Sequence, residues 1–485
     1  MKTQLIINNE NIDASTGATF QRINPLTGNV ITEGAAASVD DANKAADAAA
    51  EAFKTWSETG PTERRMLLLK AADILESKTP EFIDVMAGEI GASALWSGFN
   101  VMAAAALFRE AASLTTQIQG ETIPTDKPDT LSMTFRQPVG VIFSMAPWNG
   151  PVVLAARCIA YPIACGNTVV FRASEVSPKT HMLLVSALLE AGLPAGVLNV
   201  VTHASEDAGE ITSALIAHPA VRRINFTGST RVGRIIAEQA ATHLKPCLLE
   251  LGGKSPLVIL DDANIEEAVK AAIFGCFLYQ GQICMTTGRI IVDDKVADEF
   301  IEKFNAAAQQ LSAGNPAIQG HEQCIIGPLV ENTSGDRLNT IVDDAVSKGA
   351  TLVTGGGADG ATMPATILDN VTSDMRAYHE ESFGPVIAVI RVKGDKQALN
   401  TANDTEYGLS AAVFSRDIPR AMKIAKKIES GICHINGATV QNESQAPYGG
   451  SKASGYGRFD GRAVINEFTE LRWITIGANE QHYPF

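Results

Sequence analysis

Apolar and polar positions follow one pattern over the first quarter of the chain and another over the rest. Ala and Leu recur at helical spacing between residues 41 and 115, which predicts helices over 41–56, 62–77 and 80–113. The next segment, 120–138, is polar and ends in the alternating run Leu131-Ser-Met-Thr-Phe-Arg136. Alternation of this kind predicts a β-ribbon that faces solvent or a partner.

From residue 139 onward, short apolar runs alternate with helical segments. The runs predict strands over 139–145, 168–171, 197–201, 223–226 and 247–249, and the segments between them predict helices over 152–164, 178–191, 207–217 and 230–243. A second alternation after Gly253 predicts strands over 257–260, 290–292, 386–390, 411–414 and 432–435, with helices over 296–311 and 418–428. Repeated βαβ units predict an α/β fold with two parallel sheets.

The last segment, 467–485, is β-like over 471–476 and polar afterwards. A strand at that position has no evident partner within its own domain. We therefore expect it to contribute to a contact between subunits.

Composition narrows the class of protein. Hydrophobic residues make up 45% and charged residues 19% of the 485, as in soluble globular enzymes. The apolar run near the N-terminus is too short for a signal peptide, and no run reaches the roughly 18 residues of a membrane span. The formal net charge of -15 and the lack of a Lys/Arg-rich run exclude a nucleic-acid partner. The expected protein is cytoplasmic, with no membrane association.

The 7 cysteines are scattered, without a C-x-x-C pair or the Cys/His spacing of a zinc site. No metal site is expected, and the thiols should be reduced. Cys284 stands out because it follows a loop that contains Gly281, with polar Gln282 and Thr286 on either side. A thiol there is a candidate nucleophile, although a lone cysteine is more often a small core residue.

Polar or glycine-rich loops follow four of the predicted strands, over 147–149, 172–175, 227–233 and 250–254. In parallel sheets such loops meet at one edge, which is where ligands bind. Gly228 and Ser229 open a helix and would present N–H groups to a phosphate, or Ser229 is an ordinary N-cap. The run 355–360 matches G-x-G-x-x-G, but Pro364 follows, so we do not expect a nucleotide site there.

Two glutamates near these loops are candidates for chemistry. Glu175 could accept hydrogen bonds from a ribose, or be a solvated loop carboxylate. Glu250 lies between Leu249 and Leu251, so partial burial should raise its pKa towards that of a general base.

Five segments, in this order and spacing, resemble motifs of the NAD(P)-dependent aldehyde dehydrogenase superfamily. They are Pro147-Trp-Asn149, Phe226-Thr-Gly-Ser-Thr230, Glu250-Leu-Gly-Gly-Lys254, Gly281-Gln-Ile-Cys284 and Glu381-Ser-Phe-Gly-Pro385. The resemblance runs nearly end to end. The segments 91–96, 155–157 and 455–462 are most similar to dehydrogenases of aromatic aldehydes, first salicylaldehyde and then vanillin and benzaldehyde.

The resemblance implies a Rossmann-type NAD-binding domain over 1–119 and 139–252, a catalytic domain over 253–455, and oligomerisation elements over 120–138 and 467–485. It also implies that Cys284 attacks the aldehyde, that Asn149 and the Cys284 N–H bind the oxyanion, and that Glu250 activates water. The implied cofactor contacts are Trp148, Arg172, Glu175, Gly228, Ser229, Glu381 and Phe383. The implied substrate wall is Trp96, Gly150, Leu154, Arg157, Tyr279 and Tyr448, with Arg157 placed to hold a ring hydroxyl.

Three positions depart from the pattern of the superfamily. Arg172 stands where most members have Lys, and the two cations differ in shape. Because Glu175 would repel a 2'-phosphate, NAD is still expected over NADP. Cys158 and Phe459 replace a Lys and a Glu that are thought to relay protons in many relatives, so Glu250 is the only clear base.

Several alternatives stay open at this point. The same fold could act on aliphatic aldehydes or semialdehydes. Transfer to coenzyme A is less expected, since such relatives generally lack the glutamate at 250. A non-catalytic binding protein would retain the fold but not the complete set of Cys284, Glu250 and Asn149. The expected partners are an aromatic aldehyde and further copies of the chain, in a homodimer or homotetramer.

Overall fold

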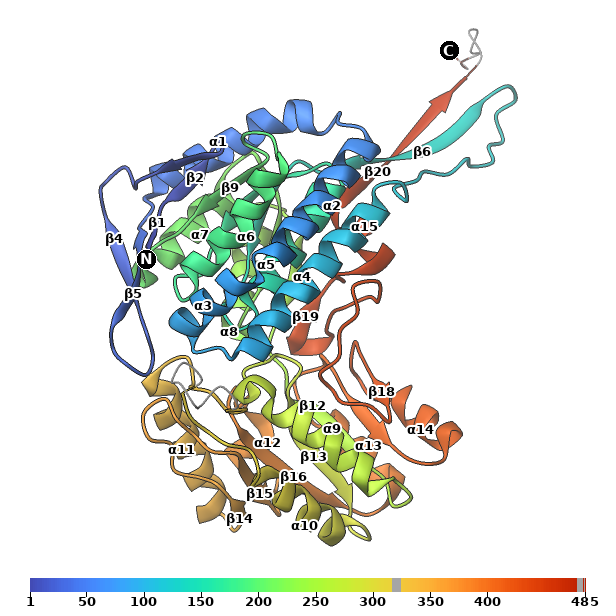
Figure 1. The fold of residues 1–485 in the computed structure, drawn as a ribbon. Helices are drawn as coiled ribbons and strands as arrows, with labels where there is room; N and C mark the ends of the chain where they lie inside the picture. Colours follow the sequence, from blue (N-terminus) through green and yellow to red (C-terminus); the bar gives the residue numbers. More distant parts are fainter. Residues whose placement is uncertain (316–323, 478–482, 484) are drawn as a thin grey trace.

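The computed structural model describes residues 1–315 and 324–477, together with 483 and 485. Within these residues the strands form sheets of eight, seven, three and two strands. Figure 1 shows the two large sheets in separate halves of the molecule, each packed against helices, and the two-stranded ribbon projecting from one side. The predicted α/β class with two mainly parallel sheets is confirmed.

The eight-stranded sheet has the order β19-β11-β10-β7-β8-β9-β2-β3. Strands β11 to β9 in this order are parallel neighbours, as the βαβ pattern predicts. Antiparallel strands extend both edges. The strands are β2 (Leu5–Ile7), β3 (Glu10–Ile12), β7 (Val141–Met145), β8 (Thr168–Arg172), β9 (Leu198–Val201), β10 (Val221–Thr227), β11 (Cys247–Glu250) and β19 (Gly455–Tyr456).

Ser38, Ser93 and Ser229 cap the first turns of three helices in this half of the molecule. One prediction was wrong: the run 80–113 forms two helices, because Gly91 adopts a left-handed φ of 64° and Ser93 caps the next helix through the N–H of Trp96. The helices are α1 (Val39–Trp56), α2 (Pro61–Ser77), α3 (Thr79–Ile90), α4 (Ala94–Leu114), α5 (Pro151–Ala164), α6 (Pro178–Ala191), η1 (Ser205–Asp207), α7 (Ala208–Ala217), α8 (Thr230–Thr242), η4 (Gly461–Ala463) and α15 (Val464–Phe468).

The seven-stranded sheet has the order β14-β15-β16-β13-β12-β17-β18 and is parallel except at β14. The strands are β12 (Ser255–Ile259), β13 (Thr287–Asp293), β14 (Thr351–Thr354), β15 (Thr366–Asp369), β16 (Val386–Val392), β17 (Ala412–Phe414) and β18 (His434–Ile435). Its helices are α9 (Ile265–Phe277), η2 (Leu278–Gly281), α10 (Ala297–Ala308), α11 (Asn332–Ser347), α12 (Arg376–His379), α13 (Gly394–Asn403), α14 (Ile418–Ala425) and η3 (Lys452–Ser454). The G-x-G-x-x-G run at 355–360 connects β14 to β15 and opens no helix, as expected.

The N-terminal strands were not predicted. Besides β2 and β3, they include a three-stranded sheet of β1 (Lys2–Thr3), β5 (Val30–Ala35) and β4 (Thr19–Ile23). Strand β2 joins the edge of the large sheet by pairing with β9. The first residues therefore join the half of the molecule that is built mainly from residues 39–250 and that also includes residues 455–468.

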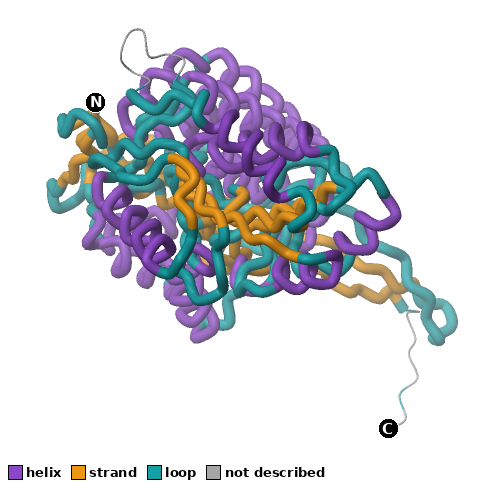
Figure 2. Tube along the Cα trace, turned by 90° about the horizontal axis from the view of Figure 1, so that it is seen from below, coloured by secondary structure: helices purple, strands orange, loops and turns teal. Residues whose placement is uncertain are grey.

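The ribbon pairs β6 (Leu131–Pro138) with β20 (Thr469–Ile476) in antiparallel register, from Thr469 opposite Pro138 to Ile476 opposite Leu131. The C-terminal strand thus has a partner within its own chain. Figures 1 and 2 both show the ribbon extending away from the body of the molecule. Its apolar side chains are exposed, with Trp473 69% accessible. Part of the expected oligomerisation element, 478–482 and 484, lies outside the described residues.

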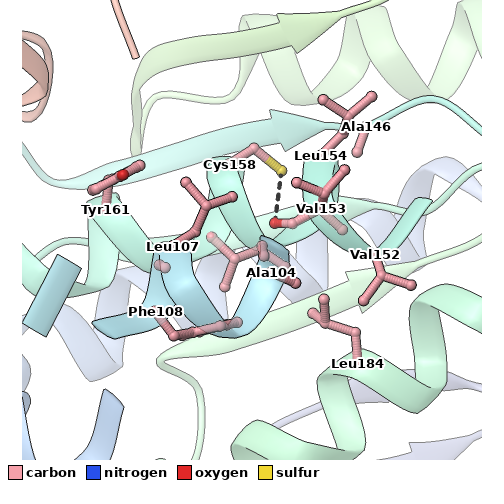
Figure 3. Close-up of a cluster of buried hydrophobic side chains, with 14 of the residues drawn as sticks. Ala104, Leu107, Phe108, Ala146, Val152, Val153, Leu154, Cys158, Tyr161 and Leu184 are labelled. Atoms are coloured by element: carbon pink, nitrogen blue, oxygen red, sulfur yellow. Dashed lines mark hydrogen bonds between the residues drawn. The ribbon is translucent and has the colours of Figure 1, made fainter. Parts of the chain in front are cut away.

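The core that supports the site lies where α4 and α5 pack on the eight-stranded sheet. Every residue of α5 is buried, and apolar side chains of α4 and α6 surround it (Figure 3). Cys158 belongs to this core: its thiol donates to the carbonyl of Ala155 at 3.3 Å.

No helix among the described residues is long and apolar enough to cross a membrane. The division into cofactor and catalytic domains stays a prediction.

Candidate active site

The loop that carries Cys284 is held in a strained backbone conformation. Tyr279, Gln280 and Gly281 all have positive φ, of 49°, 56° and 70°. A side chain in this region costs roughly 1–2 kcal/mol per residue, so the surroundings must hold the loop. The amide of Gln280 does so by donating to the carbonyl of Pro328 at 2.9 Å.

The next residue of the loop, Gln282, forms two further contacts. Its side-chain oxygen accepts the N–H of Val330 at 3.0 Å, and its carbonyl accepts the side-chain amide of Asn149 at 2.9 Å. The carbonyl of Asn149 in turn accepts the indole N–H of Trp96 at 3.0 Å. Asn149, at the end of β7, is thereby fixed against the loop of Cys284.

Cys284 is half-buried, and its Sγ lies 3.3 Å from the hydroxyl of Tyr448. Burial raises the pKa of this thiol to about 11, against the hydrogen bond from Tyr448 and the charge of Arg157, while Glu250 raises it further. The resting group at neutral pH is therefore a thiol.

Glu250 occupies the last position of β11 and is 2% exposed. Burial raises its pKa to about 8, partly opposed by Arg157. Oε1 accepts the N–H of Gly450 at 3.3 Å, and the buried Oε2 has no hydrogen-bond partner among the described residues. A carboxylate with a free oxygen and a pKa near neutrality has the properties of a general base.

A mostly apolar cavity of about 490 Å³ opens on one side of Cys284. Its lining residues are Leu95, Trp96, Phe99, Asn149, Gly150, Val153, Leu154, Arg157, Phe274, Leu278, Ile283, Cys284, Met285, Ala438, Val440, Gln441, Asn442 and Tyr448. Five of the six predicted wall residues are among them. At Gly150, a Cβ would lie 3.2 Å from a methyl of Val153, so the glycine keeps this part of the wall open.

The sequence reasoning missed Phe99 and Phe274 in this wall. Phe99 lies one helical turn after Trp96 on α4, and their rings stack with centroids 5.4 Å apart. That i, i+3 spacing was a readable signal. Phe274 comes from α9, which was not predicted.

One predicted wall residue, Tyr279, lies outside the lining, and another, Arg157, also has a partner within the protein. The ring of Tyr279 stacks on Trp96 with centroids 4.8 Å apart and supports it from behind. Arg157 lines the cavity, but its Nε and Nη2 donate to Asp460 at 3.2 and 2.9 Å. Two of its five N–H donors are thus engaged within the protein, and its role toward a ring hydroxyl stays a prediction.

A second cavity, of about 330 Å³, meets Cys284 from the other side. Its lining residues are Pro147, Trp148, Asn149, Leu154, Thr227, Gly228, Ser229, Glu250, Leu251, Gly252, Cys284, Arg337, Glu381 and Phe383. Five of the predicted cofactor contacts are in this set. It lies at the ends of β7, β10 and β11, where ligands of parallel sheets bind.

Glycines in and beside this second cavity allow close packing that a side chain would prevent. A Cβ at Gly252 would lie 2.7 Å from the carboxylate of Glu381, and one at Gly253 would lie 2.4 Å from the carbonyl of Cys284. Ser229 caps α8 through the N–H of Val232, so the positive end of the helix faces this region. These features fit a phosphate-bearing ligand.

Glu381 is anchored at the other wall of this cavity. Its Oε1 accepts the N–H of Gly253 at 2.9 Å, and burial raises its pKa to about 6. Phe383 meets Trp148 edge to face, with centroids 5.7 Å apart. Arg337, which was not predicted, donates to the carbonyls of Glu381 and Ser382 and holds this segment in place.

Arg172 and Glu175 lie at the end of β8, next to β7 on the same sheet edge. Glu175 lines a neighbouring surface pocket together with Arg22, Glu206 and Glu331. Arg172 points elsewhere: it donates to the hydroxyl of Thr212 at 2.9 Å, and burial lowers its pKa.

The two unusual positions of the sequence, Cys158 and Phe459, are both fully buried. Burial raises the pKa of the Cys158 thiol far above its ordinary value, and Phe459 cannot ionise. Neither can relay a proton at neutral pH, because the Cys158 thiol keeps its proton and the Phe459 ring has none to exchange.

Comparison with known proteins agrees with the arrangement. The family model described as "Aldehyde dehydrogenase family" matches residues 12–474. A salicylaldehyde dehydrogenase of Pseudomonas putida is 64% identical, and a vanillin dehydrogenase of Pseudomonas fluorescens 54% identical, with 100% and 99% of both chains covered. The crystal structure of the salicylaldehyde dehydrogenase of Pseudomonas putida G7 complexed with salicylaldehyde superposes with a TM-score of 0.98 at 64% identity, over 100% of both chains. The chain belongs to the aldehyde dehydrogenase family.

Proposed function

We propose that this protein oxidises an aromatic aldehyde of the salicylaldehyde type to its carboxylic acid, with NAD as the hydride acceptor. The observation that carries the proposal is the position of Cys284 between two cavities, one apolar and one at the sheet edge. The relative that is 64% identical was crystallised with salicylaldehyde, which supports the choice of substrate.

Cys284 loses its thiol proton to solvent water, and the resulting thiolate attacks the aldehyde carbon, so that the carbonyl oxygen becomes the oxyanion of a thiohemiacetal. Asn149 is placed to stabilise that charge, because its amide has two N–H donors and only one is engaged by Gln282. The N–H of Cys284 supplies a second donor.

The residues around the second cavity would hold NAD, and its nicotinamide ring would supply the acceptor for the hydride that leaves the thiohemiacetal carbon. What remains on Cys284 is a thioester. Glu250 then takes a proton from water through its free Oε2, and the resulting hydroxide attacks the thioester carbon. The acid leaves, and the sulfur is released as thiolate.

The lining of the first cavity favours an aromatic substrate. Trp96, Phe99 and Phe274 surround it, and flat rings stack against such walls. Few polar groups line it apart from those near Cys284, so a small polar aldehyde would gain little from binding.

The charges around Glu175 support NAD over NADP. Glu175, Glu206 and Glu331 share one pocket, and three carboxylates would repel a 2'-phosphate. Arg172, the cation that could attract a phosphate, is engaged by Thr212.

We also infer a cytoplasmic location, because all seven cysteines are free, as in a reducing compartment.

The test is NADH formation by the purified protein with salicylaldehyde, benzaldehyde and hexanal, each with NAD and with NADP. The expected kcat/KM is highest for the aromatic aldehydes with NAD, and Cys284→Ala is inactive. No NADH from any aromatic aldehyde, or undiminished activity in Cys284→Ala, would refute the proposal. Preference for hexanal would replace it with an aliphatic substrate.

A further inference from the structure

The hydroxyl of Tyr448 is the nearest polar side-chain partner of the Cys284 sulfur, at 3.3 Å. Tyr448 is 3% exposed, and burial raises the pKa of its phenol well above the ordinary value. The phenol therefore keeps its proton at any working pH. Once Cys284 is a thiolate, only Tyr448 can be the donor in this contact.

A buried ion pair lies against one face of the Tyr448 ring. The guanidinium carbon of Arg157 is 4.0 Å from the ring centroid, and Arg157 forms a two-pronged salt bridge with Asp460. Arg157 and Asp460 are 3% and 0% exposed. A cation on the π face withdraws electron density from the phenol and makes its O–H a stronger donor.

Residues 459 and 460 also fix the backbone of Tyr448. The N–H and carbonyl of Phe459 pair with those of Tyr448, both at 2.8 Å. Asp460, next in the chain, has a φ of 63°, which is unfavourable for a residue with a side chain and is retained only when the surroundings require it. The strained residue is therefore the one that directs the carboxylate at Arg157.

We propose that Tyr448 is a catalytic residue that donates a hydrogen bond to the Cys284 thiolate, and that the Arg157–Asp460 pair is the positioning element that holds and polarises Tyr448. The proposal rests on the nucleophilic role proposed for Cys284. It assigns Tyr448 a role in the chemistry beyond that of a cavity wall. It also gives Arg157 a task other than binding a ring hydroxyl.

The expected change in the pKa of the Cys284 thiol follows from the strength of a hydrogen bond to a charged group. Loss of such a bond should raise the pKa of the thiol by about one to two pH units, which is roughly a ten- to hundred-fold loss of thiolate. Tyr448→Phe keeps the ring and its contact with Arg157 and removes only the donor.

The test is the pH dependence of alkylation by iodoacetamide, followed on the Cys284 peptide by mass spectrometry without aldehyde. Tyr448→Phe should move the midpoint upward by one to two pH units. Tyr378→Phe is the matched control, because Tyr378 also packs under an arginine and donates to Asp404 at 2.8 Å, far from Cys284. It should leave the midpoint unchanged. An unchanged midpoint in Tyr448→Phe overturns the role of Tyr448.

Asp460→Asn tests the positioning element. Removal of a negative charge would by itself lower the pKa of the thiol, whereas release of Tyr448 raises it. An upward shift in Asp460→Asn that disappears in the Tyr448→Phe background supports positioning through the hydroxyl. A shift that persists in that background, or a downward shift in Asp460→Asn alone, overturns it. The thiol titration needs no turnover, so its failure is distinct from failure of the proposed function.

Discussion

Replacement of Glu250 by Gln should slow hydrolysis of the thioester and, at alkaline pH, stabilise the fold. Burial raises the pKa of Glu250 from 4.5 to about 8, so the folded chain binds this proton more tightly than the unfolded chain does. The stability that the bound proton contributes is fully present below pH 4.5 and is lost as the pH rises through about 8. Above that pH the folded protein holds a buried carboxylate.

The size of this change in stability follows from the pKa of Glu250 in the unfolded chain, 4.5, and in the folded chain, about 8. The difference is about 3.5 units, and at roughly 1.4 kcal/mol per unit it corresponds to about 5 kcal/mol. Between pH 5 and pH 9 the free energy of unfolding of Glu250→Gln, relative to the wild type, should rise by roughly 4 kcal/mol. Unpaired amide donors of Gln cost about 1–3 kcal/mol at every pH and leave this trend unchanged.

Two measurements check the prediction. In thermal melts at pH 5 and pH 9, the difference in Tm should move in favour of Glu250→Gln at the higher pH. In stopped-flow assays the variant should give a burst of about one NADH per site, followed by turnover some 10²–10⁴-fold slower than the wild type. Glu89→Gln, at another fully buried glutamate outside the two cavities, should keep normal turnover. A Tm difference that is the same at both pH values, or undiminished turnover, would refute the reasoning.

Three further predictions concern other parts of the molecule. Trp96→Ala removes a stacking wall of the first cavity and should lower kcat/KM for salicylaldehyde about ten- to hundred-fold, with a smaller loss for hexanal. Glu175→Ser removes one of three carboxylates from its pocket and should raise kcat/KM with NADP at least several-fold relative to NAD, measured in parallel assays. Trp473→Glu places a charge on the exposed ribbon and should shift the mass in sedimentation from dimer or tetramer towards monomer; a wild-type monomer would contradict the predicted interface.

The fold could be predicted where local signals and tertiary packing agree. Helix 178–191 was placed to the residue, because Pro178 begins it and Gly192 ends it with a left-handed φ. The split at Gly91 was missed because apolar residues continue on both sides of it. The N-terminal strands were missed because none of their sequences alternates apolar and polar positions with a period of two.

The sheet topology was enough to predict which strand-end loops form part of the candidate site. Loops at the carboxyl ends of parallel strands meet at one edge, which brings Asn149 and Glu250 together. Cys284 reaches the same cavity from the loop before β13 of the other sheet. The direction in which a side chain points cannot be predicted from the neighbouring residues in the sequence. Tyr279 supports the wall from behind, and Arg157 turns to Asp460, because both choices depend on residues that are distant in the sequence.

Burial at the junction of the two cavities sets the pH range in which the protein is active. Cys284 has a pKa of about 11 and Glu250 of about 8, so both groups are mostly neutral at pH 7. Arg157 is neutralised by Asp460, and the cluster carries little net charge at rest. Only about a tenth of Glu250 is carboxylate at pH 7, so thioester hydrolysis should rise nearly ten-fold per pH unit and level off above about pH 8. The burial that raises the pKa of Glu250 thus places this step under the control of pH.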